Sequence, residues 1–177
     1  MRLTVHGKHF HLDGRPHFLR TVTYGPFPET SGHSPEKDFP QIRSAGFDSV
    51  RVYALPDRHL LDHAAQNDLI IIATHAWGHG CDFITVNPSL LDQARRDLTA
   101  WLESHKNLPG LGAILVGNEI PSDMARWMTP WKVSQALDGL IRTCQKVAPN
   151  IPVGYANFPT TEYLEPPSAD FTAFNIY

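Results

Sequence analysis

Short apolar runs alternate with amphipathic segments along most of this chain. Runs typical of buried strands occur at 18–24, 49–54, 69–74, 111–117, 152–156 and 171–177. Among the first five runs lie segments whose apolar residues recur every three or four positions, which predicts helices at 36–45, 57–67, 88–106 and 130–147. Three of these helices follow a capping residue and a proline, at 34–35, 87–88 and 129–130, a pattern typical of helix N-termini.

The order of the elements predicts an α/β fold with a parallel sheet and right-handed crossovers. Residues 3–13 alternate in polarity around Gly7 and Lys8, which predicts an N-terminal β-hairpin, with a turn after it at 13–16. A doubly wound sheet is complete with about five or six strands, whereas a (β/α)8 barrel needs eight strands and about 250 residues. Local pattern alone favours the doubly wound sheet, but no glycine-rich phosphate loop follows the first strand, which weakens a nucleotide-binding version.

Composition is that of one globular domain spanning residues 1–177. The 177 residues are 42% hydrophobic and 19% charged, and the net charge of −3 argues against binding to nucleic acid or to an anionic membrane. No segment reaches the roughly 18 consecutive apolar residues that span a bilayer. The N-terminus lacks the apolar region of a signal peptide, so a cytoplasmic location is expected. Cys81 and Cys144 are predicted to be free thiols.

A carboxylate ends the fourth of the six apolar runs, in the sequence LVGNE at 115–119. The carboxyl ends of parallel strands meet at one mouth, where α/β folds carry out their chemistry. The predicted mouth residues are mainly aromatic rings and amides: Tyr24, Arg51, Tyr53, His75, Trp77, Asn118, Glu119, Asn157, Phe158, Asn175 and Tyr177. Rings stack on sugars, while amides and arginine bind hydroxyls. The pattern therefore predicts a polyhydroxylated substrate, with Glu119 as general acid/base.

Two of these residues have structural alternatives. In the structural alternative, Glu119 caps the helix or loop that begins at Pro121, Ser122 and Asp123. Arg51 would be a partner in a structural ion pair, although an arginine beside a mouth carboxylate also holds that carboxylate ionised.

A group of zinc-ligand types lies in the predicted loop after the third run, comprising His75, His79, Cys81 and Asp82. Their spacing matches no standard zinc pattern, so no metal and no cofactor are predicted, and His75 is expected to face the substrate. Trp77 and Trp127 are either sugar platforms or loop-packing residues, and loop packing is favoured for Trp127.

Several motifs resemble known glycoside hydrolases. The segments VRVYA, GNEI and FTAFNIY resemble clan A, whose retaining TIM-barrel enzymes carry a Glu acid/base after strand four and a Glu nucleophile after strand seven. DFPQIRSAGFDSVRVYAL and IPVGYAN are also similar to fungal β-1,3-glucanosyltransferases. TYGPF, LLDHAA, VGNEIPSDMARW and YANFPTTEYLE more closely resemble the hydrolase-like N-terminal domain of large bacterial proteins that also carry a family-two glycosyltransferase domain.

The resemblance covers nearly the whole chain and implies an incomplete (β/α)8 barrel, strands 1–6 of 8, preceded by the short hairpin. It implies a glycoside hydrolase or transglycosidase that acts on β-linked glucan-type polysaccharide with retention. Glu119 would be the acid/base, Asn118 would bind a sugar 2-hydroxyl, and Arg51 would support the nucleophile. Tyr177 would lie near the nucleophile or the glycone. The other expected substrate contacts are Tyr24, Tyr53, His75, Trp77 and Asn157.

One departure from that pattern is the missing second carboxylate. None of the other candidate carboxylates ends a predicted strand in the expected place: Glu162, Glu165, Asp82 and Asp123. Glu162 is the best stand-in among them. The chain is therefore expected to be a fragment that is inactive by itself. The alternative is a non-catalytic carbohydrate-binding or regulatory module, fused to or associated with a polysaccharide-synthesising glycosyltransferase. An open arc of six strands also leaves two unpaired edges, which favours self-association.

Overall fold

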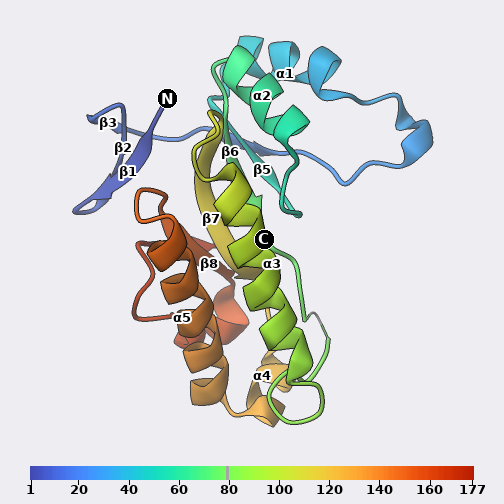
Figure 1. Ribbon diagram of the computed structural model, residues 1–177, viewed down its shortest axis with the longest axis vertical. Helices are drawn as coiled ribbons and strands as arrows, with labels where there is room; N and C mark the ends of the chain where they lie inside the picture. Colours follow the sequence, from blue (N-terminus) through green and yellow to red (C-terminus); the bar gives the residue numbers. More distant parts are fainter. Residues whose placement is uncertain (79) are drawn as a thin grey trace.

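The computed structural model describes residues 1–78 and 80–177, which form two sheets and their helices (Figure 1). The antiparallel sheet contains β1 (Leu3–His6), β2 (His9–Leu12) and β3 (Arg15–His17). The parallel sheet contains β4 (Thr21–Thr23), β5 (Ser49–Val52), β6 (Ile70–Thr74), β7 (Leu111–Asn118), β8 (Val153–Asn157) and β9 (Phe171–Phe174). The helices are α1 (Pro35–Ser44), α2 (Arg58–Gln66), α3 (Ser89–His105), α4 (Ser122–Met128) and α5 (Pro130–Val147), with 3-10 turns η1 (Glu29–Ser31) and η2 (Pro159–Leu164).

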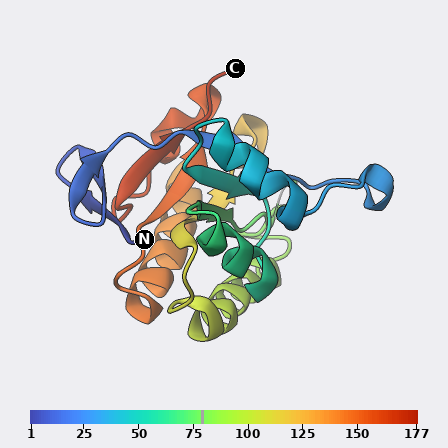
Figure 2. The ribbon, with the colours of Figure 1, turned by 90° about the horizontal axis from the view of Figure 1, so that it is seen from above.

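Strand order distinguishes the two predicted architectures. Each parallel strand pairs with the strand before it in the chain, in the order β4-β5-β6-β7-β8-β9. A doubly wound sheet reverses direction at its first strand and places that strand inside, so this alternative is wrong. The sequential order is that of a barrel, and the six strands curl into an arc (Figure 2). Within the described chain, β4 and β9 are the edges of this arc.

The helices cover the convex face of the arc, where most of the core lies. One cluster of buried side chains joins the helices to the sheet, and α3 lies beside α5 across β7 and β8 (Figure 1). β7 is buried from Leu111 to Gly117, which explains its uninterrupted apolar sequence. Gly110, at the start of β7, has φ +86, and a Cβ there would lie 2.3 Å from the Leu61 carbonyl oxygen, so only glycine fits beside α2.

The N-terminal sheet packs against the concave side of the arc. Leu3 is buried there with Ile70 and Ala113 of the parallel sheet. The buried Asp48 ties the two sheets together, because it accepts hydrogen bonds from His17 Nε2 at 2.7 Å and from the Arg20 backbone N–H at 2.9 Å. The antiparallel sheet is therefore attached to the concave side near the amino ends of β5 and β6.

Two elements differ from the prediction. The expected hairpin has a third strand, since Arg15–His17 pairs with β2 after the turn. Pro16 is accommodated because β3 is an edge strand. The short helix α4 follows Glu119 and was not predicted. Its N-cap is Pro121, so Glu119 is not the cap of this helix.

The predicted helix starts are confirmed to within about two residues. Asp57 caps α2, because its side chain accepts a hydrogen bond from the Leu60 N–H at 2.8 Å. Ser34 and Thr129 precede α1 and α5, and neither side chain makes a capping hydrogen bond within the described chain. Cys81 is exposed, Cys144 is buried, and both are free thiols as predicted. Among the described residues, no helix has the length and apolar character needed to cross a membrane.

Candidate active site

The end of β7 turns sharply at Glu119. This residue has φ +45, a conformation that is uncommon for a residue with a side chain. Its backbone N–H donates to the Ala156 carbonyl at 2.9 Å, and the next N–H, that of Ile120, donates to the Tyr155 hydroxyl at 2.9 Å. Both bonds come from β8, and Tyr155 is buried. The neighbouring strand therefore fixes the turn that presents Glu119 at the mouth.

Two donors from the C-terminal segment hold the Glu119 carboxylate. Asn175 Nδ2 donates to Oε1 at 2.6 Å, and the Tyr177 hydroxyl donates to the same oxygen. Tyr177 is otherwise exposed, and its hydrogen bond to the carboxylate raises the pKa of the phenol, which favours the protonated donor. Both bonds fall on Oε1, and Oε2 accepts no hydrogen bond from the described residues.

Arg51 connects the mouth residues of four strands. Its guanidinium donates to Asn118 Oδ1 at 2.7 Å and to Asn175 Oδ1 at 2.8 Å, while Nε donates to Thr74 Oγ1 at 3.3 Å. The guanidinium carbon also lies 4.8 Å from the centroid of the Tyr53 ring, a cation–π distance. Because Arg51 holds the Asn175 amide oxygen, it directs the amide nitrogen at Glu119.

This network borders a hollow of about 440 Å³ on the concave side of the arc. Its polar lining includes Arg51, Asn175 and His17, its apolar lining includes Phe10 and Phe171, and Glu119 is not among its lining residues. Arg51 and Asn175 therefore belong both to the hollow and to the Glu119 network. Within that network the carboxyl group can give and accept a proton, while the amides and the arginine can bind hydroxyl groups.

Five predicted site residues come together at the mouth. They are Glu119, Asn118, Arg51, Tyr53 and Tyr177, linked by the hydrogen bonds and the cation–π contact above. Asn175 was recognised from the sequence only as a strand-end residue, with no assigned role. In the structure it bonds to Asn118, Glu119 and Arg51, and so it is the centre of the network.

Three predicted substrate contacts are instead occupied within the protein. Asn157 is fully buried, and its Oδ1 accepts from the Phe158 N–H at 2.9 Å and from Thr161 Oγ1 at 2.9 Å, so its predicted substrate contact is not supported. The Tyr24 hydroxyl donates to Asp38 at 2.8 Å, anchoring α1, and burial raises the pKa of that phenol. Trp77 Nε1 donates to the Val116 carbonyl at 2.7 Å. The polar groups of Tyr24 and Trp77 are therefore committed to packing.

His75 lies after β6 and differs from these three. Its Nε2 is buried and finds no hydrogen-bond partner among the described residues. Burial lowers the pKa of His75, and a weaker attraction from Asp97 opposes this shift, so the ring is neutral at neutral pH. An unpaired buried nitrogen of this kind suits a ligand hydroxyl or a water molecule.

The loop that holds the remaining zinc-ligand types is organised around Asp82. Its carboxylate accepts from Ile84 N–H, Thr85 N–H and Thr85 Oγ1, and also from Trp127 Nε1 at 3.0 Å. These hydrogen bonds, that of the Thr85 hydroxyl first, lower the pKa of Asp82. Trp127 therefore helps to pack this loop as predicted, while His79 lies outside the described residues.

Comparison with known proteins identifies the fold. No family model and no curated protein matches the chain. A β-glucuronidase from Ruminococcus gnavus, solved in complex with D-glucuronic acid, superposes with a TM-score of 0.80 at 19% identity, over 99% of this chain and 30% of that one. A Bacteroides uniformis β-glucuronidase 2, covalently bound to cyclophellitol-6-carboxylate aziridine, gives a TM-score of 0.75 at 18% identity. This superposition covers 96% of this chain and 22% of that one. The fold is that of part of a (β/α)8 barrel, as in these two structures.

The likeness confirms the predicted barrel architecture at the level of the fold. The identities of 18% and 19% are too low to carry over an activity, and the chain spans only 22% to 30% of these two proteins. Function must therefore be argued from the site itself.

Proposed function

We propose that residues 1–177 carry the acid/base half of a retaining glycosidase or transglycosidase site for β-linked glucan-type polysaccharide. The observation that supports this most directly is the Glu119 turn, in which a carboxylate is presented in a strained backbone conformation and oriented by Asn175 and Tyr177. Strain at a side chain held by several partners is typical of functional sites. The proposal is also supported by the position of this turn after β7, because enzymes with (β/α)8 barrels act at the carboxyl ends of the barrel strands.

In the proposed reaction, Glu119 protonates the glycosidic oxygen while a second carboxylate attacks the anomeric carbon and forms a glycosyl-enzyme. Glu119 then removes a proton from water or from an acceptor sugar, and the bond to the enzyme breaks. Retention requires two carboxyl groups about 5–5.5 Å apart. The described residues bring no second carboxylate into the hydrogen-bond network of Glu119, so we assign the nucleophile to a segment outside these 177 residues.

The experiment measures turnover of aryl β-glucosides, aryl β-glucuronides and β-glucan oligosaccharides by the 177-residue chain and by the whole protein that contains it. The glucuronide is included because the structural neighbours are β-glucuronidases. We expect turnover by the whole protein, abolished by Glu119→Gln, and none by the chain alone. Glu103→Gln is the matched control, because Glu103 is an exposed glutamate of α3, and it should leave turnover unchanged. Unchanged turnover in Glu119→Gln would refute the assignment.

A second candidate is a non-catalytic carbohydrate-binding or regulatory module of a polysaccharide-synthesising glycosyltransferase. It is favoured by the same missing carboxylate and by the committed Oε1 of Glu119, which suit a hydrogen-bonding role as well as proton transfer. Calorimetry with β-glucan oligosaccharides distinguishes the two. Binding that survives Glu119→Gln, in a whole protein that hydrolyses nothing, would support the module.

We further propose that the edge strand β9 associates with the same edge of a second copy of the chain. At the end of β9 and just beyond it, Phe174, Ile176 and Tyr177 expose 38%, 79% and 95% of their surface. Unpaired strand edges with apolar side chains favour association. Sedimentation velocity of the 177-residue chain tests this proposal, since a strictly monomeric chain at all concentrations would contradict self-association.

A further inference from the structure

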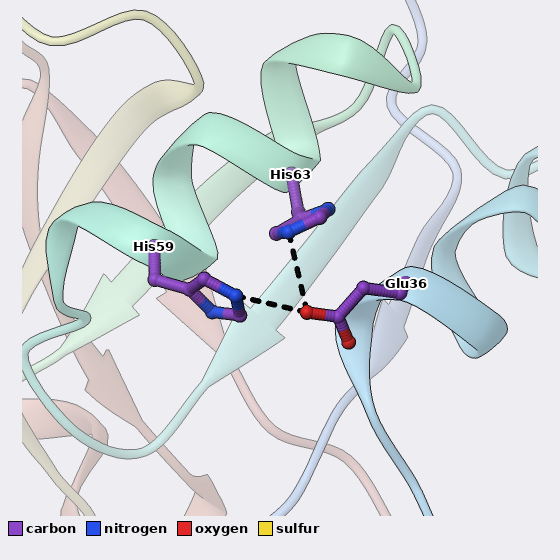
Figure 3. A group of neighbouring side chains, drawn as sticks. All are labelled: Glu36, His59 and His63. Atoms are coloured by element: carbon purple, nitrogen blue, oxygen red, sulfur yellow. Dashed lines mark ion pairs between the residues drawn. The ribbon is translucent and has the colours of Figure 1, made fainter.

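A second cluster of reactive side chains lies between α1 and α2. His59 and His63 are four residues apart on α2, so they face the same side of the helix, and Glu36 reaches them from the first turn of α1 (Figure 3). Their ligand atoms lie within 4.8 Å of one another. None of the three takes part in the Glu119 network.

The distances suit a small tetrahedral metal ion. Glu36 Oε1 lies 2.8 Å from His59 Nε2 and 3.3 Å from His63 Nε2. In a zinc site with bonds of about 2.0–2.1 Å, neighbouring ligand atoms are about 3.3 Å apart. The Glu36–His63 pair already has this separation, and the Glu36–His59 pair needs to open by about half an ångström. The ligand atoms of the third pair, His59 and His63, lie within 4.8 Å of each other. Both imidazoles direct the same nitrogen, Nε2, at the carboxylate (Figure 3).

The cluster is accessible and has ligand types that bind zinc. The His63 side chain is 20% exposed, while those of His59 and Glu36 are about half exposed, so a hydrated ion can reach all three. Two imidazoles and one carboxylate form a ligand set that zinc prefers.

We propose that Glu36, His59 and His63 form a zinc site with three protein ligands and a fourth position open to water. The ion would bridge the helices that follow β4 and β5. The i, i+4 histidine pair supplies two ligands from one rigid helix, and the glutamate from α1 makes binding depend on how the two helices pack.

Isothermal titration of the 177-residue protein with zinc chloride, in a chelator-free buffer, tests the proposal. We expect one saturable site, weakened at least tenfold by His63→Ala and also by Glu36→Gln. The control is His11→Ala, which removes a histidine of β2 whose ring lies 5.4 Å from His6, and it should leave the affinity unchanged. Thermal unfolding without metal verifies that each variant is folded.

A second measurement has a direct spectroscopic readout. Cobalt(II) in a tetrahedral site gives visible d–d bands, which should appear with the wild-type protein, persist in His11→Ala and disappear in His63→Ala. Equal zinc affinity in the wild type and in His63→Ala would overturn the proposal. Absence of saturable zinc binding to the wild type, or loss of binding in His11→Ala alone, would overturn it as well.

Discussion

The strained backbone at Glu119 makes an unusual prediction about glycine. In an ordinary helix or strand, glycine is about 0.5–1 kcal/mol less favourable than alanine, because it loses more conformational entropy on folding. A left-handed conformation costs a residue with a Cβ about 1–2 kcal/mol. Glu119 has φ +45, and its N–H must stay in place to bond Ala156. Two substitutions that both remove the carboxylate, Glu119→Ala and Glu119→Gly, therefore differ chiefly in backbone strain.

The difference between these two terms gives the expected result. Glu119→Gly should be more stable than Glu119→Ala by up to about 1.5 kcal/mol, which is the reverse of the usual order. Urea unfolding followed by circular dichroism measures both free energies of unfolding. Arg96 provides the control pair, since it is exposed in the interior of α3, where glycine should be about 1 kcal/mol worse than alanine. If glycine were the less stable residue at both positions, the reasoning about strain at Glu119 would be wrong.

Three further predictions concern the surroundings of this turn. Tyr155→Phe leaves the buried Ile120 N–H without its acceptor and should lower the free energy of unfolding by about 1–3 kcal/mol, and an unchanged urea midpoint would contradict this. Gly154→Ala places a Cβ 2.7 Å from the Phe171 carbonyl oxygen, so β8 and β9 must separate. The free energy of unfolding should fall by about 1–3 kcal/mol, and an unchanged melting temperature would contradict this prediction. Burial lowers the pKa of His75 in the folded protein below its ordinary value of about 6.5, so the unfolded chain binds more protons at this residue. The stability that is present above about pH 6.5 is therefore lost as the pH falls through the pKa of the folded state. His75→Leu should therefore show a shallower loss of stability between about pH 7 and pH 5 than the wild type, whereas parallel pH profiles would contradict the assignment.

The individual helices and strands could be predicted, because the spacing of apolar residues along a segment shows which of its faces is buried. The segment at 130–147 repeats its apolar residues at helical spacing and forms α5 over the same residues. The order of the strands could not be predicted in this way, since a periodic pattern says which face is buried and not which strand lies beside it. The sequence resemblance, rather than the local pattern, indicated the barrel. Helix α4 has only seven residues, too few for periodicity to distinguish it from a loop.

Strand parity explains why Asn157 is buried while Asn175 joins the mouth network. Side chains alternate between the faces of a strand, so residues two apart share a face. Tyr155 is buried against the helices on the convex side, and Asn157 shares its face. Phe171 packs on the concave side, and Asn175 continues its alternation just beyond β9. Counting parity from the apolar residues would have distinguished these two strand-end asparagines before the structure was known.

Asn175 also links the stability of the sheet edge to the chemistry of the mouth. Its backbone N–H donates to the Asn157 carbonyl at 2.8 Å, which continues the pairing of β9 with β8, while its side chain joins Arg51 to Glu119. Tyr177, the other donor to Glu119, lies two residues further along the same segment. Both groups that orient the carboxylate thus depend on an edge strand with neighbours on one side only, within the described chain. Any segment that pairs with the free edge of β9 would reduce fraying of that strand, and so would order the carboxylate at the same time.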